Sequence, residues 1–218
     1  MNFARLYPLI LTHVVAVLIV ALFCTVNTAP TLLAGKLPET QDIFLAMLQG
    51  QCISLPLMLF PVVLTFILPD GKATFKSWFA KPAISFRGGV WCFIMMLLCS
   101  NAFLTVLAPS EEQPIVALFQ CLEGWEIAII SSFICIIVPL IEELLFRGVL
   151  MRALPTTIAL IYSSLIFASA HGINLYVVPL FFTGWMLGLI RTRTESLIPS
   201  ICCHAAFNTT SLFITFIA

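Results

Sequence analysis

The sequence predicts an all-α integral membrane protein, a polytopic bundle of about seven transmembrane helices. Of its 218 residues, 61% are hydrophobic and 9% are charged, and the mean hydropathy is +1.11. Such values are typical of membrane proteins and not of water-soluble domains. Seven segments are long and apolar enough to be considered as spans, and splitting the long fourth one would make eight. No internal repeat or long linker divides the chain, so residues 1–218 are predicted to form one domain.

The seven segments follow one another with short connections. In chain order they are roughly 8–27, 44–68, 88–108, 126–152, 156–172, 175–190 and 197–217. The fifth and sixth are short and are separated by only three residues, 172–174, so a tilted pair and a partly re-entrant hairpin are both open. The polar stretch 69–87, punctuated by Pro and Gly, is predicted to be a connecting loop.

The distribution of basic residues predicts the topology. The largest basic cluster lies between the second and third segments and consists of Lys72, Lys76, Lys81 and Arg87. Because positively charged loops stay inside, this cluster and the N-terminus are placed in the cytoplasm. A plasma-membrane protein with several spans follows, and a small chain with short loops is typical of bacteria.

Charge and cysteine spacing exclude other classes. Lys plus Arg and Asp plus Glu each number 10, and no basic run is present, so nothing predicts binding to nucleic acid. The eight cysteines form no CxxC pair and no zinc-finger spacing. We therefore predict no structural metal and interpret the cysteines as small apolar side chains.

Charged residues interrupt the apolar fourth segment in the stretch VPLIEELLFRG, residues 138–148. Glu143 and Arg147 are spaced i, i+4 and can form an ion pair on one helix face, whereas Glu142 points about 100° away. An unpaired intramembrane carboxylate indicates a functional site. The alternative is an interfacial position, with Arg147 and Arg152 reaching towards water.

Two histidines lie in later apolar segments. The pairs Phe167/His171 and His204/Asn208 are each spaced i, i+4, so each pair shares a helix face. A single membrane histidine is usually a packing residue, but these residues together with Glu142 indicate a polar site. A straight helix from residue 156 would carry His171 about 22 Å along its axis, away from the depth of Glu142. We therefore expect the helix either to enter obliquely or to begin below the interface near Pro155.

The sixth segment contains Gly184 and Gly188 in a GxxxG step. Small residues at this spacing let two membrane helices approach closely. We expect this step to bring the polar faces of neighbouring helices together.

Three motifs resemble the CPBP family, the CAAX proteases and bacteriocin-processing enzymes. The EExxxR motif followed by Gly corresponds to Glu142, Glu143, Arg147 and Gly148; FxxxH corresponds to Phe167 and His171; HxxxN corresponds to His204 and Asn208. The resemblance covers about 126–210, whereas residues 1–125 are similar to the family only in being apolar.

This resemblance implies peptide-bond hydrolysis within the membrane. Glu142 would take a proton from a water molecule that His171 orients, and His204 and Asn208 would donate hydrogen bonds to the oxyanion. Glu143 and Arg147 would hold the helix in orientation, with Phe167 beside them. A water nucleophile needs a base, and a tetrahedral intermediate needs fixed donors, so the chemistry agrees with these roles. The expected substrate is a membrane-associated peptide or protein tail, with the bilayer as the other partner.

Several alternatives remain open from the sequence. A zinc ion held by Glu142, His171 and His204 would give a metal-dependent version of the same protease. The lack of an HExxH pair and the presence of Asn208 favour a mechanism without a cofactor. A non-catalytic bacteriocin-immunity or scaffold protein would keep the fold without hydrolysis, and a small transporter would use the glutamate and histidines as a proton relay.

Overall fold

The computed structural model describes residues 11, 14–18, 40–68, 70–82, 86–107, 122–152, 154–171 and 176–217. All regular structure in these residues is helical, which confirms the all-α prediction. The main α-helices are α2 (Thr40–Ile67), α3 (Gly71–Trp78), α4 (Phe86–Leu107), α6 (Gly124–Ser132), α7 (Val138–Glu142), α8 (Thr156–Ala170), α9 (Val177–Thr194) and α10 (Ile198–Ile217). Six predicted segments thus correspond to helices; most of the first, 8–27, lies outside the described residues.

The fourth segment is one continuous helix, 124–152, which contains two π-helical turns. The turns are η1 (Phe133–Ile137) and η2 (Glu143–Val149), and a 3-10 turn, η3 (Leu150–Arg152), ends the helix. Pro139 lies at the start of α7 and has no N–H to donate to the preceding turn, which accounts for the widening at η1. The first residues of the EExxxR motif therefore lie where α7 passes into the wider turn η2.

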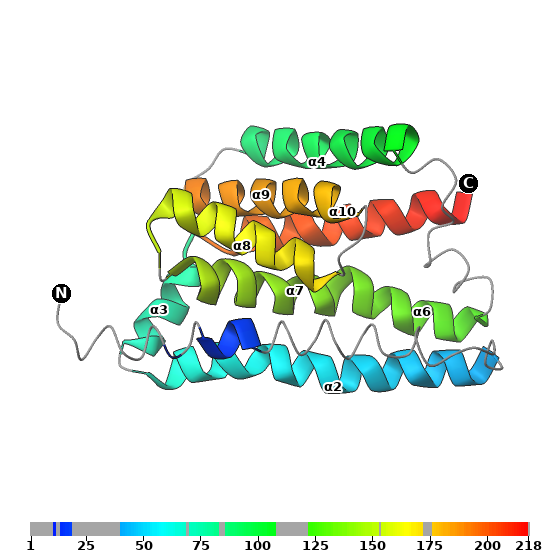
Figure 1. The fold of residues 1–218 in the computed structure, drawn as a ribbon, viewed down its shortest axis with the longest axis horizontal. Helices are drawn as coiled ribbons and strands as arrows, with labels where there is room; N and C mark the ends of the chain where they lie inside the picture. The colour runs from blue at the N-terminus through cyan, green and yellow to red at the C-terminus, as the bar shows by residue number, and fades with distance from the viewer. Residues whose placement is uncertain are drawn as a thin grey trace.

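The helices pack in layers around this long helix (Figure 1). Helix α2 runs along one side of it, whereas α8, α9 and α10 lie on the other side, and α4 lies outermost against α9 and α10. Helix α8 crosses α7 obliquely, so its C-terminal end comes down onto the long helix. This crossing brings His171 close to Glu142, and the oblique entry of the helix into the membrane stays a prediction.

The predicted glycine step packs α9 closely against α8. A Cβ added at Gly184 would lie 3.1 Å from Cδ1 of Phe167 and 3.2 Å from Cα of Ser164. A Cβ added at Gly188 would lie 2.6 Å from Cδ2 of Leu160. Both positions are too tight for a larger residue without movement, which confirms the predicted close approach.

The stretch 69–87 is not simply a loop, because it contains the helix α3. Trp78 at the end of α3 is only 2% exposed and packs on Gly148, where a Cβ would meet its ring at 3.0 Å. The backbone carbonyl of Trp78 accepts a hydrogen bond of 2.7 Å from the N–H of Leu197. The loop prediction weighed the polar residues of this stretch and missed the aromatic side chain that docks it on the core.

Length and composition identify one membrane-span candidate among the described residues, the helix Gly124–Arg152, which contains an 18-residue window with a mean hydropathy of 2.2. A second candidate results if the sharply bent pair Gln51–Ile67 and Gly71–Trp78 is counted as one span. The predicted number of seven spans therefore stays a prediction.

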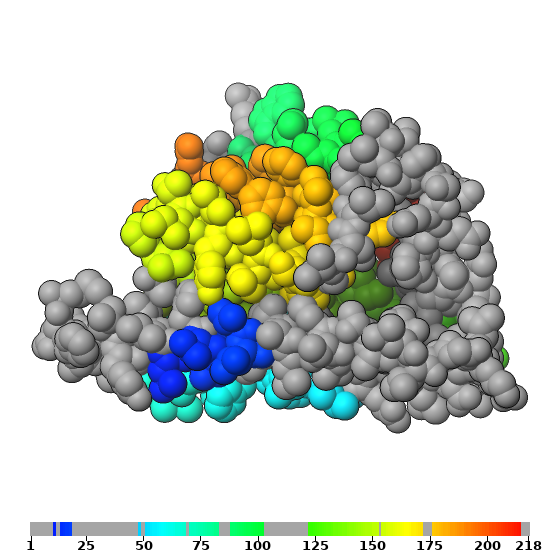
Figure 2. All heavy atoms as spheres, in the orientation of Figure 1, coloured from blue at the N-terminus to red at the C-terminus, as the bar shows by residue number. Residues whose placement is uncertain are grey.

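Helix α8 lies at the surface on the face drawn in Figure 2. Its apolar side chains Ile158, Ile161 and Leu165 are between 40% and 55% exposed. Their i, i+3, i+7 spacing places them on one side of the helix. An apolar stripe that faces outwards while polar residues face inwards is typical of a helix in contact with lipid.

Candidate active site

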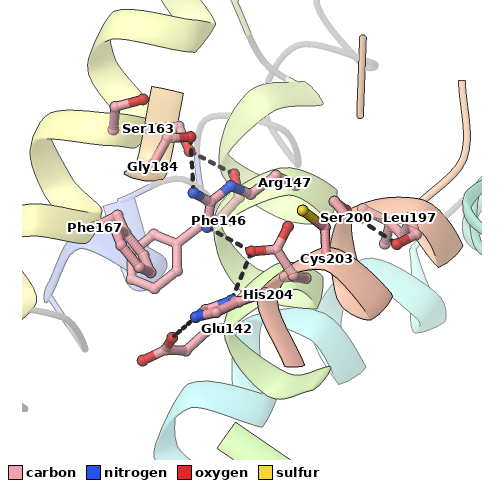
Figure 3. A network of polar contacts seen from close by, with 12 residues as sticks. Glu142, Phe146, Arg147, Ser163, Phe167, Gly184, Leu197, Ser200, Cys203 and His204 are labelled. Atoms are coloured by element: carbon pink, nitrogen blue, oxygen red, sulfur yellow. Dashed lines mark hydrogen bonds and ion pairs between the residues drawn. The ribbon is translucent and has the colours of Figure 1, made fainter. Parts of the chain in front are cut away.

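An ion pair is buried where the long helix passes into η2. Nη1 of Arg147 lies 2.8 Å from Oε1 of Glu143, and both side chains are fully buried. Nη2 of Arg147 also donates a hydrogen bond of 2.9 Å to the backbone carbonyl of Gly184 on α9. The predicted i, i+4 pairing is confirmed, and the arginine additionally ties the long helix to α9 (Figure 3). Arg147 is only 1% exposed, so its side chain does not reach the protein surface as the interfacial alternative required.

Glu142 faces the two histidines of the motifs. Its carboxylate oxygens lie 3.7 Å from Nε2 of His171 and 3.6 Å from Nε2 of His204. Figure 3 shows Glu142 and His204 turned towards one another. The residue is 3% exposed, and its Oε2 has no hydrogen-bond partner among the described residues. Burying a carboxylate without a hydrogen-bond partner lowers the stability of the folded protein. Glu142 therefore indicates a functional site and not a stabilising contact.

The second nitrogen of each imidazole is anchored. Nδ1 of His204 lies 3.1 Å from Oε1 of Glu143, and Nδ1 of His171 lies 2.9 Å from the backbone carbonyl of Phe167. Because a carbonyl and a carboxylate accept hydrogen bonds, each Nδ1 carries the proton. Both Nε2 atoms therefore face Glu142 as acceptors when the rings are neutral and as donors when the rings are charged.

The side-chain charges nearly balance. With both glutamates and Arg147 ionised, the buried cluster carries one net negative charge. A proton on one of the two histidines would make the cluster neutral. A neutral cluster is less costly to bury, because each charge then has a partner of opposite sign. The exposed fraction of the His171 side chain is 33%, compared with 4% for His204. The cluster is therefore accessible from the protein surface on the side of His171.

Phe167 connects the members of this cluster. Its ring centroid lies 4.6 Å from Cζ of Arg147, 4.8 Å from the ring of His171 and 5.7 Å from the ring of His204. The arginine therefore has a cation–π contact, and the histidines have an apolar wall. FxxxH works here as a unit, since the carbonyl of Phe167 orients His171 while its ring supports Arg147 and His204.

Asn208 makes a contact that the sequence did not predict. Its Nδ2 donates a hydrogen bond of 2.9 Å to the backbone carbonyl of Ile134 in η1. That carbonyl lacks its usual helical donors, because the N–H of Val138 donates to the carbonyl of Phe133 and Pro139 has no N–H. The π turn therefore creates an acceptor that Asn208 fills, and one amide hydrogen of Asn208 remains for another partner.

A parallel contact supports η2. The N–H of Leu150 donates to the carbonyl of Leu145, five residues back. The carbonyl of Phe146 therefore does not receive the hydrogen bond that this N–H would donate in an α-helix. Oγ of Ser163 on α8 donates to this carbonyl at 2.9 Å. Neither Ser163 nor the carbonyl of Gly184 was identified from the sequence. The only available signal was the GxxxG step, which indicated close packing and gave no hint of a polar contact.

No group of three or more His, Cys, Asp or Glu side chains within the described ranges is arranged to hold a metal ion. The ligand set considered from the sequence, Glu142, His171 and His204, does come together, at the separations given above. The two unprotonated Nε2 positions would have the correct tautomer for a ligand. A zinc ion at this position would take Glu142 and the two Nε2 atoms as ligands.

Comparison with known proteins agrees with the motifs. Residues 124–210 match the family model described as type II CAAX prenyl endopeptidase Rce1-like. The matched part is a little under half of the chain and contains Glu142, Glu143, Arg147, His171, His204 and Asn208. No curated protein and no solved structure matches the chain. This segment is therefore similar to a family of CAAX-type membrane proteases, in agreement with the CPBP motifs.

Proposed function

We propose that this protein is an intramembrane endopeptidase of the glutamic type, which hydrolyses a peptide bond in a membrane-associated peptide or protein tail. It would lie in the plasma membrane with several spans, a cytoplasmic N-terminus and a site open to the cytoplasm. The observation that carries the proposal is the position of Glu142. This buried carboxylate lies between two imidazole nitrogens at distances of 3.6 and 3.7 Å, longer than direct hydrogen bonds.

These distances suit a water molecule held between the side chains. A water that donates one hydrogen to Glu142 and the other to Nε2 of His171 keeps its oxygen lone pairs free for attack. As that oxygen bonds to the substrate carbonyl carbon, Glu142 accepts its proton. When the carbon–nitrogen bond breaks, the same proton passes from Glu142 to the leaving amine. The atoms balance with water as the only other reactant.

The tetrahedral intermediate requires donors for its oxyanion. Nδ1 of His204 is held by Glu143, so protonated His204 directs an N–H from Nε2 into the site. Asn208 lies one turn further along the same face of α10, and we assign its second amide hydrogen to the oxyanion. Removal of one such donor typically costs about 10²–10³ in kcat. Glu143 and Arg147 act indirectly, because they fix the ring of His204.

The first test compares membranes containing the wild type, Glu142→Gln and Glu126→Gln. Glu126 is a matched control because it is buried on the same long helix and its Oε2 accepts a hydrogen bond from the N–H of Glu123, a role that glutamine retains. Membrane peptides would be compared by mass spectrometry, with and without a chelator. The expected result is a product that is present in the wild type and in Glu126→Gln and absent in Glu142→Gln.

The other outcomes separate the alternatives. A product that disappears when the chelator is added would support the zinc-dependent version. Identical peptides from all three proteins, at equal protein levels, would contradict proteolysis at this site and favour an immunity or scaffold protein. Proton flux in proteoliposomes that Glu142→Gln abolishes, without any cleavage, would support the relay.

A further inference from the structure

A second polar site lies at the end of the bundle where α3, the last turns of the long helix and the end of α9 meet. A cavity of about 260 Å³ opens there. Three arginines line it, Arg147, Arg152 and Arg191, and no carboxylate is present among its described lining residues. Trp78, Gly148 and Met151 are its less polar lining residues. The cavity has room for several water molecules, which occupy about 30 Å³ each in the liquid.

Two of these arginines have buried donors without a hydrogen-bond partner in the described part of the chain. They are Nε of Arg147 and Nε of Arg191. The Arg147 side chain is fully buried, and its other nitrogens contact Glu143 and the carbonyl of Gly184. Unsatisfied buried donors are rare and call for a partner, and here they belong to residues that line one cavity.

The carboxylates near the cavity do not pair with all of its arginines. Glu143 and Glu142 interact electrostatically with Arg147, and Glu195 interacts with Arg191. No ion pair joins Arg152 to a carboxylate in the described part of the chain, so this guanidinium group adds positive charge to the cavity. Guanidinium groups bind phosphate oxygens through paired, charge-assisted hydrogen bonds.

We propose that this cavity binds a phosphate group, carried either by a lipid headgroup or by a small soluble phosphate. The predicted topology places this end of the bundle at the cytoplasmic interface, where basic pockets between membrane helices bind headgroups. The site is separate from the Glu142 cluster, although Arg147 belongs to both. Binding of the phosphate does not depend on peptide hydrolysis.

The test uses the full-length protein purified in a non-ionic detergent. Isothermal titration calorimetry would measure binding of inorganic phosphate, of dihexanoyl phosphatidylglycerol and of acetate, at constant ionic strength. Wild type would be compared with Arg191→Gln and with Arg193→Gln. Arg193 is the matched control, because it is exposed, lies two residues away and is outside the cavity lining. If Arg191→Gln does not fold, Arg152→Gln provides the same comparison.

We expect one phosphate ligand per chain and an affinity lowered about tenfold or more in Arg191→Gln, the equivalent of one charge-assisted contact. Arg193→Gln should bind like the wild type. Binding of the lipid alone identifies a headgroup site, and binding of inorganic phosphate with equal affinity identifies a soluble ligand. Three results would overturn the proposal: no binding to the wild type, equal loss in Arg193→Gln, or acetate binding as tightly as phosphate.

Discussion

The buried pair of Glu143 and Arg147 offers a quantitative test of the network behind the active site. At 2.8 Å and an effective dielectric constant of about 20, the Coulomb attraction is about 6 kcal/mol. In Glu143→Gln, Arg147 keeps its hydrogen bond to Gly184 and its contact with Phe167, which offset part of this loss. We expect this variant and Arg147→Met each to lower the free energy of unfolding by about 3–5 kcal/mol, because each leaves one buried charge without its partner.

The double variant should be less destabilised than either single variant. With both charges removed, no ion remains buried without compensation, and neutral replacements of a buried pair are often tolerated. Unfolding of the purified protein in mixed micelles, titrated with a denaturing detergent and followed by circular dichroism, would measure all four proteins. A coupling energy of about 2 kcal/mol or more is expected. Losses that add within about 0.5 kcal/mol would refute the reasoning, since additivity means that the two side chains act independently.

Three further predictions concern packing and can be measured by the same unfolding assay. Gly184→Ala should be less stable than Gly89→Ala by about 1–3 kcal/mol, because a Cβ added at Gly184 is crowded whereas one added at Gly89 meets no atom within 4 Å. Equal stabilities of the two variants would contradict the close contact between α8 and α9. Trp78→Ala should cost about 3–5 kcal/mol as a buried aromatic deletion, and a cost under about 1 kcal/mol would show that α3 is not docked. Ser163→Ala should lower the free energy of unfolding by about 1–3 kcal/mol, because the buried carbonyl of Phe146 loses its donor. Ser132→Ala removes an exposed hydrogen bond and should change the stability little. A larger loss in Ser132→Ala than in Ser163→Ala would contradict the role of Ser163 in supporting η2.

Much of the helical framework could be predicted because it follows from local composition. Apolar runs of about 20 residues predict where helices lie, and the i, i+4 spacing of Glu143 and Arg147 predicts their ion pair. The same spacing placed His171 and His204 on helix faces with Phe167 and Asn208. Local periodicity does not report which residues from distant segments meet, and it is silent about π turns.

The sequence therefore determined the helices, the family motifs and the set of polar residues that form the site, because each depends on residues close together in the chain. The packing of α8 and α10 on the long helix decided the rest. It brings His171 and His204 to Glu142 and gives Asn208 the carbonyl of Ile134 as a partner, while α3 packs Trp78 against Gly148. These contacts join residues from 29 to 74 positions apart, and their formation depends on helix crossing and close packing rather than on any local pattern.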